Sequence, residues 1–231
     1  MAERGKVGLV LAGGGARGAY EAGVLSELLP ELERRGERPQ VIVGTSVGAI
    51  NAAFLGSTAH LGAEQATAEW RERWLELAPE RVVRPILRHQ APRTVARYAG
   101  EVLGLPGVRL EALLDPEPLG RTLDRWVDWP CLHRNVRART VDAVAVAATS
   151  ALRARSAVFV EGRRKRDLRD SQAIDYVSAR LDVDLVMASA AIPTVFPAVW
   201  VEKPKAVRGW YFDGGTRLNT PIKPALDLGV D

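Results

Sequence analysis

Residues 44–48 read Gly-Thr-Ser-Val-Gly and fit the pattern G-x-S-x-G, in which a serine stands at the tip of a sharp turn between a strand and a helix. Gly44 and Gly48 suit such a turn because side chains two residues from the serine would collide in it. The first amides of the following helix would point toward negative charge that develops during attack. Ser46 is therefore a candidate nucleophile, and a tight turn with an idle serine is the alternative.

A second glycine-rich segment, GGGARG, lies where the free backbone amides of a strand-to-helix turn could bind negative charge. It consists of Gly13, Gly14, Gly15, Ala16, Arg17 and Gly18. The segment also fits G-x-G-x-x-G, so a nucleotide-binding α/β protein is one interpretation. However, the second strand ends in Val43-Gly44, where an acidic residue should hold the ribose. Two such turns on successive strands favour an oxyanion hole beside Ser46 and hence acyl transfer.

A catalytic serine needs a base, and the three histidines do not stand in the usual order for one. His60, His89 and His133 all follow Ser46, and none follows Asp213, so neither common Ser-His-Asp order is available. We expect His89 and His133 to be solvated because their surroundings are rich in arginine. Asp213 could instead take the serine proton directly.

Asp213 follows an apolar stretch and is flanked by Gly214 and Gly215, which would leave its carboxylate unobstructed. The alternative for this segment is an ordinary Asp-Gly turn between two strands.

The elements that must position these residues follow the alternation of a parallel α/β sheet. Continuous apolar runs at 7–12 and 41–43 predict buried strands, each followed by a glycine turn and then a helix. The helices are expected at 19–35, which contains Pro30, and at 49–55. Further strands are expected at 143–148, 157–161, 198–201 and 207–212, and a further helix at 183–192.

The arginine-rich segment 62–129 is amphipathic and is expected to form helices and loops that cover the sheet. We interpret its tryptophans and leucines as core residues, with a lid or a lipid-facing surface as the alternative. These apolar residues are Trp70, Trp74, Leu75, Ile86, Leu87, Leu103 and Leu105.

Together the motifs GGGARG, GTSVG and DGG, in this order and spacing, resemble those of the patatin-like phospholipase family. The resemblance extends through residues 188–197, Asn219 and Pro221. It implies an α/β fold of three layers, α/β/α, with a largely parallel central sheet in one domain, residues 1–231. It also implies a serine acyl hydrolase that cleaves fatty-acyl esters of lipids or phospholipids, without metal or organic cofactor.

Within that resemblance, Ser46 is the nucleophile, Asp213 is the base, and the amides of residues 13–18 form the oxyanion hole. Arg17 matches the family's basic position, where a lipid phosphate or the loop itself is its partner. Family domains continue beyond the aspartate motif, so we expect the chain to be truncated at its C-terminus. A catalytically silent lipid-binding domain stays as a further alternative.

Composition sets the outer limits on function. The chain has 231 residues, of which 47% are hydrophobic and 26% charged, which excludes a disordered chain, a coiled coil and a collagen-like rod. The single Cys131 allows neither an internal disulfide nor a cysteine-based zinc site, so we expect a reducing, cytoplasmic location. We see no secretory signal and no membrane span.

The net charge of +4 is modest, and we expect no nucleic-acid partner. The basic run 163–166 is expected to be a solvated turn, with peripheral contact to an anionic membrane surface as the alternative. The sequence does not indicate an oligomeric state.

Overall fold

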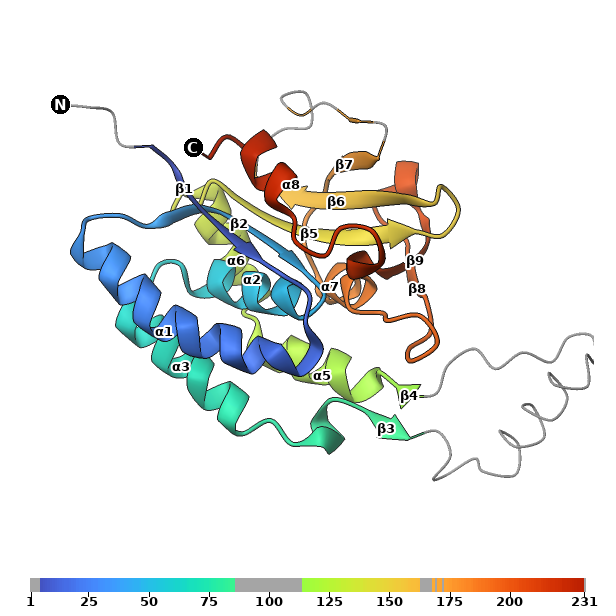
Figure 1. Cartoon of the computed structure of the whole chain (residues 1–231), viewed down its shortest axis with the longest axis horizontal. Helices are drawn as coiled ribbons and strands as arrows, with labels where there is room; N and C mark the ends of the chain where they lie inside the picture. The colour runs from blue at the N-terminus through green and yellow to red at the C-terminus, as the bar shows by residue number, and fades with distance from the viewer. Residues whose placement is uncertain (1–4, 86–113, 163–167, 169, 172, 231) are drawn as a thin grey trace, which may run out of the picture.

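The computed structural model describes residues 5–85, 114–162, 168, 170, 171 and 173–230. Its centre is a seven-stranded sheet (Figure 1). Five strands lie side by side in the order β1 (Val7–Leu11), β2 (Pro39–Thr45), β5 (Ala143–Ser150), β6 (Arg155–Glu161) and β7 (Ile174–Ser178). The hairpin of β8 (Val199–Val201) and β9 (Gly209–Asp213) completes the sheet through pairing of β9 with β5. Two-residue strands β3 (Arg84–Pro85) and β4 (Leu114–Asp115) pair separately.

Strands β1, β2 and β5 are parallel, whereas β6 and β7 are parallel to each other and antiparallel to β5. The register along β5 matters for function. Thr45, the last residue of β2, pairs with Ala147, and Asp213, the last residue of β9, pairs with Ala148. Because β6 occupies the opposite edge of β5, the ends of β2 and β9 meet head-on along one edge of this strand.

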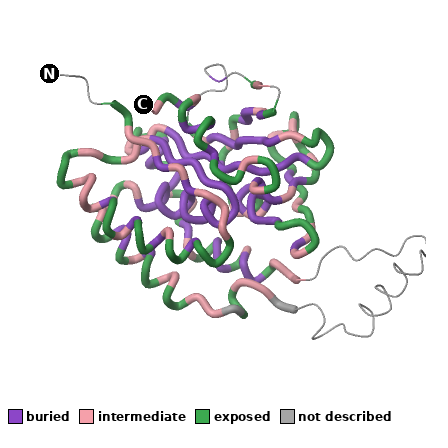
Figure 2. The backbone as a smooth tube through the Cα atoms, viewed as in Figure 1, coloured by how far each residue is buried: buried purple, intermediate pink, exposed green. Residues whose placement is uncertain are grey.

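Most helices cover one face of the sheet. Leu9, Ile42 and Val144 point toward this face, where the larger hydrophobic core lies. The helices that contribute to this core are α1 (Gly18–Arg34), α2 (Val47–Thr58), α3 (Ala63–Leu75), α5 (Glu117–Trp126), α6 (Trp129–Arg137) and α7 (Val183–Ser189). Figure 2 shows that the strands and α2 form the buried centre. Every residue of α2 is buried, as expected for a helix of small and apolar residues between the sheet and other helices.

The opposite face is covered by α8 (Ile222–Asp227) and the residues that follow it. Val41, Val43 and Ala145 point to this side, alternating with the residues that face the larger core, and Ala225 and Leu228 pack against them. The side chain of Tyr176 donates a hydrogen bond to Asp227 and ties α8 to β7. The predicted class, three layers around a largely parallel sheet, is therefore confirmed, with unequal helical layers.

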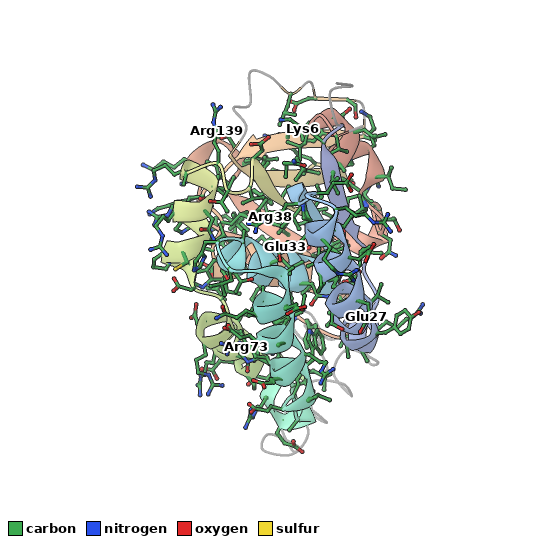
Figure 3. The ribbon with its side chains drawn as sticks, turned by 90° about the vertical axis from the view of Figure 1, so that its left-hand side faces the viewer. Lys6, Glu27, Glu33, Arg38, Arg73 and Arg139 are labelled. Atoms are coloured by element: carbon green, nitrogen blue, oxygen red, sulfur yellow. The ribbon has the colours of Figure 1, made fainter. Side chains whose placement is uncertain are left out.

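The outer helices α1 and α3 pack side by side and carry charged side chains on their solvent side (Figure 3). Glu33 joins them, since its Oε2 accepts a hydrogen bond of 2.8 Å from the backbone amide of Ala63, while its Oε1 pairs with Arg38. Within the described residues, no helix has both the length and the hydropathy needed to cross a bilayer.

Several predicted boundaries shift in the structure. The helix expected at 183–192 ends at Ser189, and residues 205–207 form a 3-10 turn, so that β9 begins at Gly209. Pro30 lies inside α1, which continues to Arg34. In the segment 62–129, Trp70 is fully buried as expected, but the expectation for Leu75 was wrong, since this side chain is 76% exposed at the end of α3.

His89, Ile86, Leu87, Leu103, Leu105 and the basic run 163–166 lie outside the described residues. The assignment of residues 1–231 to one domain, with 62–129 as its cover, stays a prediction.

Candidate active site

Ser46 occupies a strained turn between β2 and α2. Its φ of 56° and ψ of −123° lie outside the regions that residues with a side chain normally adopt. A Cβ atom on Gly44 would come within 2.1 Å of the Gly48 carbonyl oxygen, and one on Gly48 within 2.2 Å of the Leu11 carbonyl oxygen. Both glycines are thus required by close backbone approach, and they let α2 begin directly above the ends of β1 and β2.

Ser189, at the end of α7, holds the Ser46 turn in place. The Ser46 amide donates a hydrogen bond of 2.9 Å to Ser189 Oγ, which in turn donates one of 2.6 Å to the Ala147 carbonyl. Ser189 is fully buried. Ser189 falls within the expected helix 183–192 and the segment 188–197, but no local pattern indicates its role, because its partners lie more than 40 residues away.

Asp213 meets the Ser46 turn at the end of β9. Its amide donates to the Ala191 carbonyl at 2.8 Å, and its carbonyl accepts hydrogen bonds from the hydroxyls of Thr149 and Thr216 at 3.1 and 2.9 Å. A Cβ atom on Gly214 would lie 2.2 Å from the Ala147 carbonyl oxygen, so this glycine allows the chain to turn tightly against β5. Three hydrogen bonds therefore fix the backbone of Asp213.

The carboxylate of Asp213 is buried and only partly satisfied. Its Oδ1 accepts a hydrogen bond of 2.6 Å from the Gly215 amide, whereas Oδ2 has no hydrogen-bond partner of good geometry among the described residues. Burial raises the pKa of this carboxyl group, while the nearby Ser46 hydroxyl and the Gly215 amide favour its ionised form and oppose the shift. Oδ2 is an acceptor without a donor, beside a serine hydroxyl.

The glycine loop lies directly beside Ser46. A Cβ atom on Gly13 would sit 3.3 Å from Ser46 Cβ and 2.4 Å from Asn219 Oδ1, so only glycine fits. Asn219 forms hydrogen bonds to both backbone polar groups of Gly13. The Asn219 backbone carbonyl accepts one of 3.0 Å from the Gly13 amide, and Asn219 Nδ2 donates one of 3.2 Å to the Gly13 carbonyl. Asn219, identified in the sequence only through the resemblance, thus joins the loop to the segment after Asp213.

Not every amide of residues 13–18 is free to bind a ligand. The amides of Gly13, Arg17 and Gly18 donate to carbonyl oxygens within the protein. Those of Gly14, Gly15 and Ala16 have no hydrogen-bond acceptor among the described residues, and the left-handed φ of 57° at Gly15 suits glycine. These three amides are the ones available for an oxyanion.

The amino-acid sequence of this chain matches a known protein family. The family model of patatin-like phospholipases matches residues 9–226, nearly the whole chain. The chain belongs to the patatin-like phospholipase family. Lipid acyl hydrolysis is the activity of this family in general terms, and lipids are its substrates.

Among solved structures, VipD from Legionella pneumophila is similar, with 17% identity and a TM-score of 0.45. The similarity covers 95% of this chain and 47% of that one, so the chain spans about half of its length. The comparison with curated proteins found no match.

In this patatin-like chain, a polar network of Glu21, Asn51 and Trp74 contacts the residue that precedes the glycine loop. Glu21 on α1 accepts hydrogen bonds from the Ala12 amide at 3.1 Å and from Asn51 Nδ2 at 2.6 Å, and Asn51 Oδ1 accepts from Trp74 Nε1 at 3.2 Å. Burial raises the pKa of Glu21, and the donors Asn51 and Ala12 oppose this rise. The sequence analysis missed this network, since Glu21 and Asn51 look like ordinary helix residues.

The two histidines that the structure describes, His60 and His133, do not contact the serine. The expectation that His133 is solvated was wrong: it is buried, and its Nδ1 lies 2.7 Å from Glu161 Oε1. The pair lines a cavity of about 1020 Å³ at the start of β5 and the end of β6, the sheet edge opposite Ser46. His60 is exposed and contacts Asn135. Neither residue has a described contact with Ser46 or Asp213.

Arg17, the basic residue of the glycine loop, is exposed and forms no ion pair with any other described residue. A Cβ atom added to Gly14 would lie 3.2 Å from Arg17 Cβ. The Arg17 side chain therefore begins close to the free amides of Gly14, Gly15 and Ala16.

Proposed function

We propose that this chain is a serine acyl hydrolase that cleaves fatty-acyl esters of lipids through Ser46 and Asp213, with the amides of Gly14, Gly15 and Ala16 as the oxyanion hole. The observation that carries the proposal is the meeting of β2 and β9 on β5. It brings the strained serine turn next to a buried carboxylate oxygen that lacks a donor.

In the proposed mechanism, Asp213 Oδ2 accepts the proton of the Ser46 hydroxyl while Ser46 Oγ attacks the ester carbonyl carbon. The negative charge that develops on the carbonyl oxygen is stabilised by the free amides of the glycine loop, and the leaving alcohol receives the proton from Asp213. Asp213 then takes a proton from water while the water oxygen attacks the acyl carbonyl carbon, and this proton passes to Ser46 Oγ as the bond to the fatty acid breaks. In this proposal the exposed Arg17 contacts a phosphate of the substrate, and a role in shaping the glycine loop is the alternative.

The decisive experiment is labelling of the purified chain with a fluorophosphonate probe, detected by intact mass. We expect one probe per chain in the wild type and none in Ser46→Ala, because only an activated serine attacks the probe. Asp213→Asn should lose most of the labelling, since the two residues act as a unit. Ser26→Ala, on α1, is the matched control and should label like the wild type.

Three outcomes would redirect the assignment. Undiminished labelling of Asp213→Asn would exclude the dyad. Saturable binding of ATP or NAD that is indifferent to Ser46→Ala, without labelling, would favour the nucleotide-binding alternative. Vesicle binding by a folded wild type that does not label would favour a silent lipid-binding domain.

A further inference from the structure

The hairpin of β8 and β9 presents two tryptophans to solvent. Trp200 and Trp210 stand opposite each other in the register of the two strands, and their rings pack edge to face with centroids 5.3 Å apart. They are 43% and 53% exposed. Large aromatic side chains that are exposed in pairs are unusual on a protein surface that meets only water, and they mark sites of contact with an apolar partner.

The turn between the two strands is basic. Lys203, Lys205 and Arg208 are exposed, and none forms an ion pair with another described residue. Glu202 is the one acidic residue between Trp200 and Trp210, and it accepts a hydrogen bond of 2.8 Å from Trp200 Nε1. We call residues 200–210 the aromatic–basic hairpin. Indoles beside unpaired cations are the combination that suits the boundary between acyl chains and anionic head groups.

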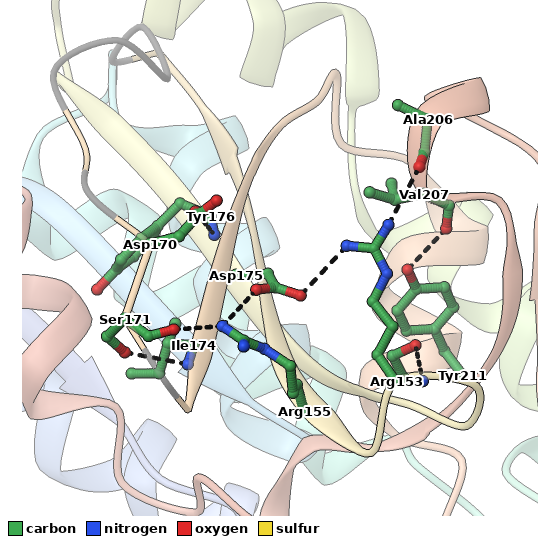
Figure 4. Close-up of polar contacts among 11 residues, drawn as sticks. Arg153, Arg155, Asp170, Ser171, Ile174, Asp175, Tyr176, Ala206, Val207 and Tyr211 are labelled. Atoms are coloured by element: carbon green, nitrogen blue, oxygen red, sulfur yellow. Dashed lines mark hydrogen bonds and ion pairs between the residues drawn. The ribbon is translucent and has the colours of Figure 1, made fainter.

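The hairpin is attached to β5 through the pairing of β9, and it contacts the neighbouring β5–β6 turn (Figure 4), where the Ala151 amide donates a hydrogen bond of 2.9 Å to the Trp210 carbonyl. The Tyr211 hydroxyl donates to the Val207 carbonyl at 2.7 Å, and Arg153 Nη2 donates to the Ala206 carbonyl at 3.5 Å while its Nη1 pairs with Asp175. In the same turn Leu152 is 86% exposed. Because these contacts order the hairpin in the free protein, insertion of the indoles does not require the surface to fold first.

We propose that the aromatic–basic hairpin docks the protein on an anionic lipid bilayer, with the two indoles at the level of the head groups. This proposal rests on the proposed function, because a hydrolase of lipid esters must reach the bilayer that contains its substrates. Two indoles and a short turn are far smaller than the roughly 800 Å² per partner of a stable protein interface. Insertion into a lipid interface needs no matching surface, and unpaired cations complement anionic head groups.

The hairpin can be altered without touching the proposed catalytic residues. Trp210 and Asp213 are three residues apart on β9, so their side chains lie on opposite faces of the strand. Asp213 is buried on the side of the larger core, together with Tyr211, whereas both indoles point to solvent. Vesicle binding and serine reactivity are therefore separable measurements.

The test is flotation of the full chain with vesicles of phosphatidylcholine, alone or mixed with phosphatidylglycerol. We expect wild type to float with the mixed vesicles, and salt to weaken this binding. Trp200→Ser/Trp210→Ser should reduce partitioning about ten-fold or more, because apolar surface is no longer buried. Lys203→Gln/Lys205→Gln should reduce it about five-fold for each cation removed, and only on anionic vesicles.

The matched control is Arg71→Gln/Leu75→Ser, which removes an exposed cation and an exposed apolar side chain from α3, away from the hairpin (Figure 1). It should float like the wild type. Equal flotation of wild type and both hairpin variants would overturn the proposal. So would a wild-type dimer that the tryptophan variant converts to a monomer while vesicle binding persists, because the hairpin would then bind a second copy.

Fluorophosphonate labelling in detergent-free buffer separates the two proposals. If hairpin variants label normally and fail to float, the docking surface is supported whatever the substrate. If Ser46 does not label in a wild type that floats through the hairpin, the proposed hydrolysis fails and the docking surface stands.

Discussion

Burial of the Asp213 carboxylate gives the proposed reaction a definite pH dependence. Desolvation raises its pKa above the ordinary aspartate value of 3.8, and the Ser46 hydroxyl and Gly215 amide offset this rise only in part. Since only the ionised form can accept a proton, we expect the rate of fluorophosphonate labelling to fall as pH decreases, with a midpoint above 3.8. Labelling rates at a series of pH values, with circular dichroism as a check on folding, measure it. A constant rate down to pH 3.8 in folded protein would contradict the role of Asp213.

The same raised pKa predicts that Asp213 lowers the stability of the fold at neutral pH. The folded state binds this proton more tightly than the unfolded chain, so stability from this group is present below pH 3.8 and is lost as pH rises through the folded-state pKa. Asp213→Asn removes the charge and keeps an oxygen for the Gly215 amide. We expect this variant to have a higher urea midpoint than wild type at pH 7, and little gain in acid.

Asp227 provides the control of opposite sign. Burial opposes ionisation, but Lys223 and Tyr176 outweigh it and hold the pKa of Asp227 below its ordinary value. Asp227→Asn should therefore lower the urea midpoint at pH 7. If the urea midpoint at pH 7 falls equally in Asp213→Asn and Asp227→Asn, burial of the Asp213 carboxylate carries no electrostatic cost.

At the level of single residues, the sequence predicted the candidate dyad but not what surrounds it. Ser46 and Asp213 stand in short motifs whose glycines mark sharp turns, and such turns are local. Ser189, Glu21 and Asn51 act through partners 9 to 143 positions away, and no local pattern indicates them. The prediction for His133 was wrong for the same reason, because this residue lies on α6 and its partner Glu161 comes from β6, 28 residues later.

Among the elements, Trp70 is the largest buried side chain between α3 and α2. Trp70 is fully buried, stacks on Phe54 with centroids 4.1 Å apart, and meets Trp74 and Trp126 edge to face. We expect Trp70→Ala to reduce the free energy of unfolding by about 3–5 kcal/mol, because it leaves a large cavity between three elements. Urea unfolding followed by circular dichroism measures this change.

Trp70→Phe separates ring packing from the polar group. Trp70 Nε1 is buried without a hydrogen-bond acceptor among the described residues, so loss of this donor offsets part of the smaller ring's cost. The loss for Trp70→Phe should be well below that for Trp70→Ala. Comparable losses would mean that the indole itself, and not its apolar area, holds α3 in place.

Most strands of the central sheet were predictable from apolar runs, whereas β7 and the lengths of the strands were not. The β-branched and alanine-rich stretch of β5 is buried on both faces and reads as a central strand. The hairpin that joins it to β6 makes that neighbour antiparallel, and a short turn alone indicates this. β9 begins at Gly209 because residues 205–207 form a turn, which contacts Tyr211 four residues later and Arg153 on a different part of the chain.

At the scale of the molecule, the candidate site and the large cavity occupy opposite edges of one sheet. Ser46 and Asp213 lie where β2 and β9 end, whereas the cavity of about 1020 Å³ lies at the start of β5. The three motifs GGGARG, GTSVG and DGG, together with the similar segment 188–197, were enough to predict the three-layer fold. The unequal layers were not predictable, since the sequence does not show that one short helix, α8, covers a face on which alternate strand residues point outward.

The head-on meeting of β2 and β9 has a mechanical consequence. Ser46 and Asp213 come from strands that do not pair with each other, yet both strands are registered on consecutive residues of β5, Ala147 and Ala148. When the sheet twists or breathes as a body, both partners move with the same reference strand, and the motion largely cancels in the distance between them. The proposed proton transfer tolerates little variation in that distance. One fully buried strand thus sets the spacing between the two backbone segments that carry the proposed pair.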